Sequence, residues 1–474
     1  MVIAVREDQI DELIEEFPGA ESAIRREVKN KADYYNKNPF QEKERKFFIE
    51  EIKRFFTLIN QDYKEPKESK KTKEKKNDEN IPATYIKEEY PLAKFKENIK
   101  KWLHIEDEEV LEVVLAGIIG EKVGGDPLWL FLIAPPGGSK TELLKSFKGN
   151  YSYHLSDMTP KTLISGLMLG DGKNRKKVKD LLPELDGKVL IFKDFTTILE
   201  KSRDQRNEII AQFREAYDGS FSKKVGTLDD TISYDSRFGL IAGVTPIIDK
   251  HWKVMQQLGE RFLKIRWRED SDKVTKRSRE NEGKEILMRK ELLENSNKFI
   301  QNLDLSVMPE FDDLKFGDKV SLIAKFIAFA RTPLSVSYNT SDFFHEYIPM
   351  PEMPTRLVKQ LKKLAKSLAL IRGKKEVSEE EIKVLLRVAK DTIPPDRLAV
   401  LETIKASQNE TLEGCKRSRI VDNIKMPRTS TELVLKQLVM LELVKETKIT
   451  ERNLGYNTEA EYFYKISSIW MDIF

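Results

Sequence analysis

The sequence predicts a multidomain protein of α/β and α type, whose core is a mostly parallel β-sheet with helices on both faces. Three successive patterns along the chain support this fold class. Apolar runs alternate with amphipathic stretches over residues 90–267, helical spacing of apolar residues continues over residues 275–391, and the pattern changes again over residues 397–474. A chain of 474 residues is long enough for roughly two to four domains, each with its own core.

The domain boundaries follow from these changes. At the N-terminus, apolar residues at helical spacing predict a small helical module over residues 1–63. The next segment, residues 64–80, is rich in charge and lacks the apolar residues needed for a core, which predicts a flexible linker. The remaining predicted units are an α/β core over residues 81–267, a helical region over residues 268–395 and a C-terminal module over residues 396–474.

Within the α/β core, each expected strand is a short apolar run and each expected helix is amphipathic. The alternation of the two is typical of parallel sheets, because parallel strands need a crossover connection between them. The expected strands are residues 128–133, 189–192, 238–242 and 262–267, and the expected helices are residues 108–119, a segment after Lys140, and residues 204–217.

Composition limits the cellular setting and the partners. The apolar segments are short and interrupted, so no membrane-spanning helix is expected. Cys415 is the single cysteine, which excludes an internal disulfide and favours a reducing, cytoplasmic location. The net charge is only +4, from 83 basic and 79 acidic side chains. Any contact with nucleic acid must therefore come from local basic patches.

The strongest motif lies between the strand at residues 128–133 and the helix after it. The order strand, glycine loop, helix is typical of a nucleoside-triphosphate site, since backbone N–H groups of the loop and the helix N-terminus attract phosphate. Lys140 is then expected to reach the β- and γ-phosphates of ATP, and the Thr141 hydroxyl to bind Mg²⁺. The alternative is an ordinary strand-to-helix turn rich in proline and glycine. The expected binding residues are Pro136, Gly137, Gly138, Ser139, Lys140 and Thr141.

A phosphate loop predicts a second strand that ends in a carboxylate, and Asp194 follows the apolar run at residues 189–192. Asp194 is a candidate Mg²⁺ ligand and catalytic residue, although it could instead cap the next helix. Two successive acids are common at this point in such ATPases, whereas this chain has Lys193 before Asp194. Either Asp194 binds the metal and the base lies elsewhere, or Asp194 is the base and Lys193 replaces the metal ligand.

Two further catalytic candidates lie near the remaining core strands. Thr245 follows the strand at residues 238–242, where a polar side chain could sense the γ-phosphate or orient water; it could also simply end the strand. Arg261 precedes the strand at residues 262–267, and an arginine from a neighbouring subunit stabilises the charge that develops during phosphoryl transfer. The alternative for Arg261 is a surface ion pair.

A short alternating run bracketed by glycines predicts a β-hairpin over residues 217–234. Lys223 and Lys224 lie at or near its expected tip, where they could contact the phosphate backbone of DNA. Such lysine pairs also keep exposed turns solvated, so this role depends on the surrounding motifs.

The order of these motifs resembles the AAA+ ATPases, and among them the minichromosome-maintenance (MCM)-like replicative helicases, including those of phages and other mobile elements. That family also has a small residue in place of the glycine before the lysine, as Ser139 does here. The hairpin with Lys223 and Lys224 is similar to the DNA-contacting hairpin of the family. Residues 242–246 are similar to the strand that bears its first sensor, and residues 260–262 to its arginine finger.

The resemblance covers roughly residues 105–395 and continues through the helical region. Residues 326–331, 355–361, 365–370 and 376–381 look like the family's lid, and Arg356 then falls at its second sensor. Two features depart from the family. The N-terminal region is short and helical, without zinc cysteines or an evident β-barrel, and Lys193 occupies a place where an acid is expected.

The C-terminal module predicts a winged helix, which consists of three helices and a two-stranded ribbon. Pro427, Arg428, Thr429 and Ser430 are expected to form a capped start to the third helix. A basic cluster before that helix favours DNA binding, whereas a protein-docking role is the alternative, because the helix itself carries only Lys436. The expected helices are residues 398–404, 419–424 and 431–443, the strands are residues 444–449 and 461–466, and the basic cluster is Lys416, Arg417, Arg419, Lys425 and Arg428.

These patterns together predict an ATP-dependent DNA helicase or translocase of the MCM-like AAA+ type. The resemblance implies a hexameric ring, since Arg261 completes a neighbour's site, with ATP and Mg²⁺ as cofactors and single-stranded or forked DNA as partner. Its setting would be replication of a plasmid, phage or mobile element, with a replication protein bound through the N-terminal module. The alternatives are a loader that remodels DNA-bound proteins without unwinding, and a nucleotide-gated DNA-binding initiator or regulator.

Overall fold

The computed structural model describes residues 90–164, 168–169, 176–177, 180–224, 231–252, 255, 260–334, 336–339, 342–345, 350–407, 414–449 and 461–474. All of these belong to one compact unit, Ile86–Phe474. The predicted N-terminal module (residues 1–63) and linker (residues 64–80) lie outside the described residues.

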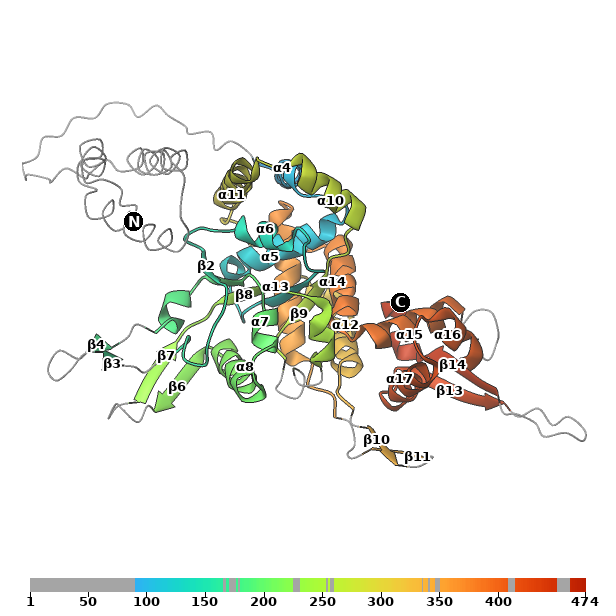
Figure 1. The fold of residues 1–474 in the computed structure, drawn as a ribbon. Helices are drawn as coiled ribbons and strands as arrows, with labels where there is room; N and C mark the ends of the chain where they lie inside the picture. Colours follow the sequence, from blue (N-terminus) through green and yellow to red (C-terminus); the bar gives the residue numbers. More distant parts are fainter. Residues whose placement is uncertain are drawn as a thin grey trace, which may run out of the picture. The chain divides into compact units, whose positions relative to one another are not determined.

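A five-stranded sheet forms the centre of this unit (Figure 1). Its order is β2-β5-β8-β1-β9, and every pair of neighbours is parallel. The expected parallel sheet is therefore confirmed. The strands are β1 (Trp129–Ile133), β2 (Ser152–Leu155), β5 (Val189–Phe192), β8 (Gly239–Val244) and β9 (Leu263–Arg266).

Alternate side chains of the central strands enter two separate cores, as the period of two in a strand requires. On β1, Leu130 and Leu132 belong to the larger core, whereas Trp129 and Phe131 belong to the other. Both faces of the sheet are thus apolar and covered, which explains why its central strands are continuous apolar runs. The face with Phe131 is covered by α7 (Thr196–Leu199), α8 (Arg203–Tyr217) and η3 (Pro246–Lys250).

The opposite face is covered first by α5 (Glu108–Val123), whose residues 110–120 are all buried. An apolar helix of this kind must be enclosed on all sides. It packs between the sheet and α13 (Thr355–Ile371). Gly117 permits this close packing, since a Cβ atom there would lie 2.5 Å from Leu130 Cδ1. Lys363 of α13 and Glu121 of α5 form a buried ion pair of 3.1 Å.

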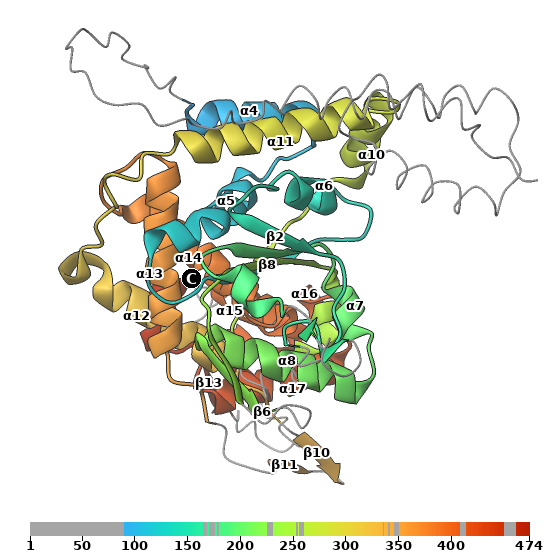
Figure 2. The same ribbon diagram turned by 90° about the vertical axis from the view of Figure 1, so that its left-hand side faces the viewer.

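A further layer of helices lies beyond the short helix α6 (Lys140–Lys145). In Figure 2, α4 (Leu92–Trp102) and α11 (Glu285–Asn302) run side by side. Their contact includes the rings of Phe95 and Phe299, whose centroids are 5.0 Å apart. The remaining helix of this layer, α10 (Ser271–Glu280), begins at an N-cap formed by Asp270.

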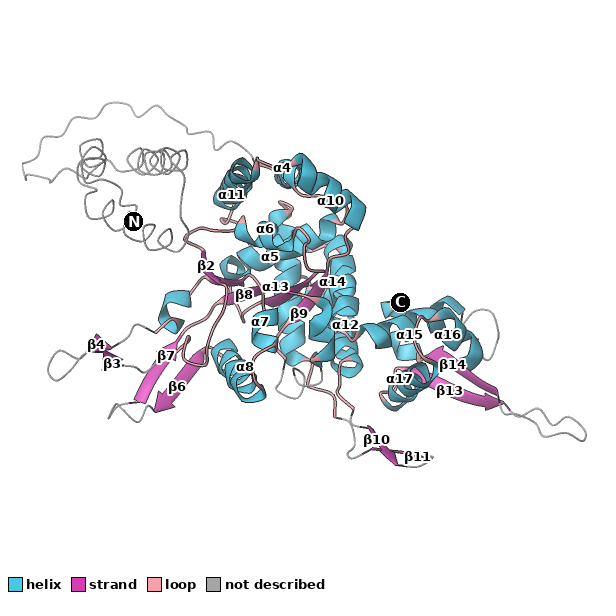
Figure 3. Ribbon diagram, in the orientation of Figure 1, coloured by secondary structure: helices cyan, strands magenta, loops and turns pink. Residues whose placement is uncertain are grey.

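The region over residues 275–391 is mostly helical, as the sequence predicts, with one exception. Besides α13, it contains α12 (Asp313–Ala330) and α14 (Glu379–Thr392). It also contains an antiparallel pair of strands, β10 (Val336–Asn339) and β11 (Asp342–His345), coloured as strands in Figure 3. The sequence Val-Ser-Tyr-Asn alternates at period two, and this local pattern overrides the helical pattern around it.

Helix α14 covers the free edge of β9, the last strand of the sheet. The Lys264 N–H donates to Thr392 Oγ1 at 3.0 Å, and the Arg266 N–H donates to Asp391 Oδ2 at 2.9 Å. These are the backbone groups that face away from β1. Side chains at the end of α14 thus satisfy an edge that would otherwise be open.

The C-terminal module has the expected three helices and two strands, with one strand more than predicted. Cys415 and Lys416 form a short third strand, β12, beside β14. The third helix begins at Arg428, with Pro427 as an N-cap that makes no side-chain hydrogen bond, so the expected side-chain cap is absent. The elements are α15 (Pro395–Ser407), β12, α16 (Arg417–Asn423), α17 (Arg428–Met440), β13 (Val444–Ile449), β14 (Glu461–Ile466) and η4 (Ser468–Ile473).

Two other pairs of strands and one short helix complete the described chain. The predicted hairpin is confirmed as an antiparallel pair, β6 with β7. A short pair, β3 with β4, was not predicted. Their bounds are β3 (Met168–Leu169), β4 (Lys176–Lys177), η2 (Leu182–Leu185), β6 (Ser220–Lys224) and β7 (Thr231–Asp235).

Candidate functional site

The carboxyl ends of four parallel strands place polar segments at one edge of the sheet. Ligands of open parallel sheets bind at this edge. The segments are residues 134–141 after β1, residues 193–196 after β5, Thr245 after β8 and residues 267–270 after β9.

The glycine loop turns at a position whose backbone conformation favours glycine. Gly137 has a φ of 80°, in the left-handed region where a side chain would be strained. At the next residue, Gly138, a Cβ atom would lie 2.2 Å from Oε2 of Glu269. The same Glu269 oxygen accepts a hydrogen bond of 3.3 Å from the Ser139 N–H. The loop therefore already holds one carboxylate oxygen against its backbone.

Lys140 is a buried cation in this loop. Lys140 is only 5% exposed, and its Nζ donates one long hydrogen bond of 3.4 Å to the Ala134 carbonyl oxygen. Among the residues described, no carboxylate oxygen lies within 4.0 Å of this ammonium. Burial lowers the pKa of Lys140, while the charges of Asp194 and Glu269 act to raise it. A buried ammonium group with so little compensation favours the binding of an anion.

Asp194 lies close enough to Lys140 for its charge to act on that ammonium. Its Oδ1 also accepts a hydrogen bond of 3.0 Å from the Thr196 N–H at the start of α7. The two roles considered from the sequence, helix cap and site carboxylate, are thus both compatible with the geometry. Thr141 lies half-buried in the first turn of α6. The charge of Lys193, in contrast to that of Asp194, acts on His154. The pKa of His154 is lowered mainly by burial, and the Lys193 charge lowers it further.

Mg²⁺ takes oxygen ligands and retains several waters, so one or two protein oxygens beside a phosphate are enough to hold it. The hydroxyl of Thr141 and the free carboxylate oxygen of Asp194 are such ligands, and the charge of Asp194 acts on Lys140 in the loop. Both residues thus supply oxygens of the kind that Mg²⁺ takes.

Thr245 lies beside the Asp194 segment because β8 pairs with β5. Its Oγ1 is 3.3 Å from Oγ1 of Thr196, and its N–H donates to the same oxygen at 3.3 Å. These two hydroxyls and the Asp194 carboxylate form one polar group next to the loop.

Three residues at this site were not identified from the sequence: Thr196, Gly243 and Glu269. A Cβ atom at Gly243 would lie 2.8 Å from the Lys193 carbonyl oxygen and 3.2 Å from Lys140 Cδ. The glycine therefore makes room for the lysine stem, and a lone glycine inside a strand is a sequence signal for such close approach. Glu269 has no such signal, since it reaches the loop only through the pairing of β9 with β1.

Arg261 and Arg356 lie together at the amino ends of the parallel strands, opposite the glycine loop. Arg261 precedes β9, whose last residue, Arg266, pairs with Ile133 next to the glycine loop. The four residues of β9 span about 10 Å at about 3.3 Å per residue. Arg261 is thus on the amino side of the sheet, away from its own chain's loop.

These two arginines line one cavity of about 430 Å³. Arg356 donates to the Glu260 carbonyl oxygen at 3.0 Å and to Glu352 at 2.6 Å. Burial lowers the pKa of Arg261, and the nearby Arg356 charge lowers it further. The Arg261 guanidinium also lies over the Tyr217 ring, 5.7 Å from its centroid. Arg261 also pairs with Asp218 at 3.7 Å, so the ion pair considered from the sequence is present.

The DNA-contact candidates lie apart from both groups. Lys223 and Lys224 are the last residues of β6 and pair with Ile232 and Thr231 of β7. The turn between the two strands, residues 225–230, lies outside the described residues.

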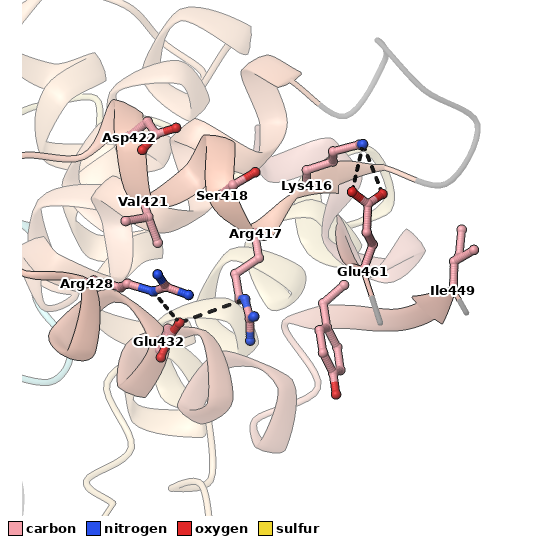
Figure 4. A pocket seen from close by; sticks show the side chains of 10 residues that line it. Lys416, Arg417, Ser418, Val421, Asp422, Arg428, Glu432, Ile449 and Glu461 are labelled. Carbon is pink, nitrogen blue, oxygen red and sulfur yellow. Dashed lines mark hydrogen bonds and ion pairs between the residues drawn. The ribbon is translucent and has the colours of Figure 1, made fainter. Parts of the chain in front are cut away.

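In the C-terminal module, Arg428 and Arg417 line a cavity of about 380 Å³ between α16, α17 and the strands. Figure 4 shows Glu432 between them, 3.1 Å from Nε of Arg428 and 3.8 Å from Nε of Arg417. Arg417 also lies over the ring of Tyr462. Arg419 is exposed on the short helix α16. The basic cluster is therefore partly neutralised by a carboxylate from the third helix.

No protein-family model matches this chain, and no curated protein is similar to it in sequence. In the part of the chain that the structure describes, no helix is long and apolar enough to cross a lipid bilayer.

Proposed function

We propose that this chain is an ATPase of the AAA+ type that acts as an MCM-like DNA helicase or translocase. The observation that carries the proposal is the buried Lys140 ammonium beside a glycine loop at the carboxyl edge of a parallel sheet. A phosphate group is the anion that such a loop accommodates best, because backbone N–H groups and a lysine converge on it.

In this proposal, Lys140 binds the β- and γ-phosphates of ATP and is the cation that balances them. The Thr141 hydroxyl and the Asp194 carboxylate hold Mg²⁺, which neutralises charge on the phosphate oxygens when bound. Thr245, whose hydroxyl lies 3.3 Å from that of Thr196, would contact the γ-phosphate or the attacking water. This division of roles makes Asp194 the metal ligand.

The two arginines on the amino side support action between subunits. Because Arg261 and Arg356 line one cavity away from the loop of their own chain, they fit the nucleotide of a neighbouring copy. A ring closes when every subunit gives this cavity to one neighbour and its loop to the other. We therefore propose a homo-oligomeric ring, of six subunits as in the family that the sequence resembles, working in the cytoplasm.

DNA is the proposed substrate of the ring. The β6–β7 hairpin would carry Lys223 and Lys224 to the DNA backbone, and α12–α14 would serve as the lid. The C-terminal module fits a winged helix, in which Arg419 and Arg428 would contact DNA. A replication protein would bind the N-terminal module, in the replication of a plasmid, phage or mobile element.

The direct test measures ATP hydrolysis and strand displacement on a forked DNA duplex with Lys140→Ala. Loss of both activities is expected, since the phosphates lose their buried cation. Lys145→Ala is the matched control, because Lys145 lies on the same helix but pairs with Glu142 at 2.9 Å. Undiminished hydrolysis in Lys140→Ala would contradict the proposal.

The same assays separate the helicase from the other two functions. Hydrolysis stimulated by DNA, without strand displacement, would identify a loader or remodeller. ATP binding without turnover would identify a nucleotide-gated regulator. The regulator is favoured by one observation, namely that Lys193 stands beside Asp194 where such ATPases commonly have a second acid.

A further inference from the structure

The carboxylate of Glu269 lies where the glycine loop would receive a phosphate oxygen. Its Oε2 accepts a hydrogen bond of 3.3 Å from the Ser139 N–H. The same oxygen lies over Gly138, so close that a Cβ atom there would be only 2.2 Å away. Glycine in the loop thus allows an acidic side chain of the same molecule to contact the backbone directly.

The surroundings of this carboxylate are poor for a structural role. Its second oxygen, Oε1, is buried and accepts no hydrogen bond from the residues described. Burial raises the pKa of Glu269, although the hydrogen bonds from Ser139 and the charge of Lys140 oppose that shift. Glu269 is only half-buried, but a carboxylate oxygen that is buried without a hydrogen bond is more stable in water. Its position is therefore one that a better anion can take over.

A nucleotide phosphate and this carboxylate cannot share the loop. Both need the Ser139 N–H, and two anions in contact repel one another. We propose that Glu269 is a tethered competitor, which occupies the phosphate loop in the absence of nucleotide and must leave it when a nucleotide binds. This inference rests on the proposed function of the loop.

The position of Glu269 in the chain determines what moves with it. On one side, β9 is held by β1 and by the end of α14, through Thr392 and Asp391. On the other side, the next residue is Asp270, whose side chain caps α10 by accepting from the N–H groups of Asp272 and Lys273. The displacement is therefore transmitted to the start of α10, since β9 is fixed. Nucleotide binding would thus be reported to the helical layer of α10 and α11.

The test is the affinity of the full chain for a non-hydrolysable ATP analogue, measured by calorimetry with Glu269→Ala and Glu269→Gln. Glu269→Ala removes a hydrogen bond to a charged group from the nucleotide-free state, so this variant should bind the analogue about tenfold more tightly than the wild type. Glu269→Gln keeps an oxygen that can accept from the Ser139 N–H but removes the charge, so it should also bind more tightly, by a smaller factor. Glu282→Gln is the control, since Glu282 is an exposed acid after α10, and its affinity should equal that of the wild type.

Every outcome of this experiment is decisive. Unchanged or weaker binding in both Glu269 variants, with clear binding by the wild type, overturns the tethered competitor and leaves the nucleotide site standing. If the affinity is unchanged and a separate assay with ATP shows a lower turnover number, the tethered competitor is also overturned, because Glu269 would then act in the reaction itself. If the wild type fails to bind and Glu269→Ala binds, the competitor is supported. If neither binds, both the inference and the proposed nucleotide site fail.

Discussion

The room around Lys140 is set by its neighbours as much as by the glycine loop. Its stem passes Gly243 of β8, and its ammonium is left with one long hydrogen bond to a carbonyl oxygen. Such a group is costly to bury and gains most from a bound anion. The site thus combines a buried cation that makes one long hydrogen bond with a strand position, Gly243, that has no side chain.

Gly243→Ala should weaken ATP binding by about tenfold or more, which needs only about 1.4 kcal/mol. The new methyl group would meet the Lys193 carbonyl oxygen at 2.8 Å and displace Lys140. Overpacking of this kind also lowers the free energy of unfolding by about 1–3 kcal/mol. Calorimetric titration with an ATP analogue and urea unfolding measure the two effects.

The control is Gly239→Ala at the start of the same strand. Its methyl group would meet Val189 and Glu121, far from the loop. Stability should fall, while the affinity for the ATP analogue stays that of the wild type. Equal affinities in Gly239→Ala and Gly243→Ala would contradict the role given to Gly243.

Glu381 is expected to make the free energy of unfolding depend on pH. It is fully buried; burial opposes ionisation, but hydrogen bonds from Ser378, Arg372 and Lys374 lower its pKa to about 2. A lowered folded-state pKa stabilises the protein at pH values above the ordinary value of 4.5, and this stability is lost as the pH falls from 4.5 toward about 2.

Glu381→Gln should therefore lower the free energy of unfolding near pH 7 by up to about 3 kcal/mol. The difference from the wild type should shrink as the pH falls below about 4.5. Urea unfolding at several pH values measures it, with the exposed Glu402→Gln as a control. A constant difference at all pH values would show that packing, not ionisation, causes the loss.

At the scale of elements, the strands that could be predicted are those buried on both faces. β1, β5 and β8 are short apolar runs, and each was located within one or two residues. β2 was missed because it lies at the edge of the sheet, and its residues Ser-Tyr-His-Leu are only partly buried. An edge strand lacks the apolar pattern that identifies a central one.

The candidate site was predictable to the same extent. Lys140, Thr141, Asp194 and Thr245 follow predicted strands directly, so the parallel sheet brings them to one edge. Glu269 also follows a predicted strand, so it lies at the same edge of the sheet. Nothing local in the sequence shows that its side chain contacts the glycine loop. Contacts of this kind depend on long-range packing, which the periodicity of a sequence does not encode.

The contact between α14 and β9 is open to a test of its own. Thr392→Val keeps the shape of the side chain but removes the acceptor for the Lys264 N–H, which is buried. The free energy of unfolding should fall by about 1–3 kcal/mol, the cost of an unsatisfied buried donor. Urea unfolding measures the change.

Thr403→Val is the matched control for Thr392→Val. Its hydroxyl donates to a carbonyl one turn earlier in α15, as Thr392 also does in α14. Only the Thr392 hydroxyl also accepts a hydrogen bond from β9, from the Lys264 N–H. A similar loss of stability in both variants would mean that the helical hydrogen bond, and not the strand edge, accounts for the effect.

At the scale of the whole molecule, the loop and the two arginines lie at opposite ends of the parallel strands. Under the proposed function, one chain carries two halves of different sites. Lys140→Ala and Arg261→Ala are each expected to abolish ATP hydrolysis, the second by about 10³-fold or more. An equal mixture of the two should hydrolyse ATP, because an intact loop then meets an intact Arg261 at some interfaces.

This complementation is measured as steady-state ATP hydrolysis after the two variants are mixed and allowed to exchange subunits. Arg279→Ala, at an exposed position on α10, replaces Arg261→Ala in the control mixture. A mixture as inactive as its two components would contradict the shared site, since an arginine acting within its own chain cannot rescue another.

The closed edge of β9 has a consequence for how copies of this chain can associate. Its outward N–H groups already have acceptors on α14, so a second molecule cannot extend the sheet there by adding a strand. Copies that meet on this side must join through side chains. Contacts between charged side chains weaken with ionic strength, whereas backbone pairing hardly responds to it. Copies that joined at this edge through charged side chains should accordingly dissociate as the ionic strength rises.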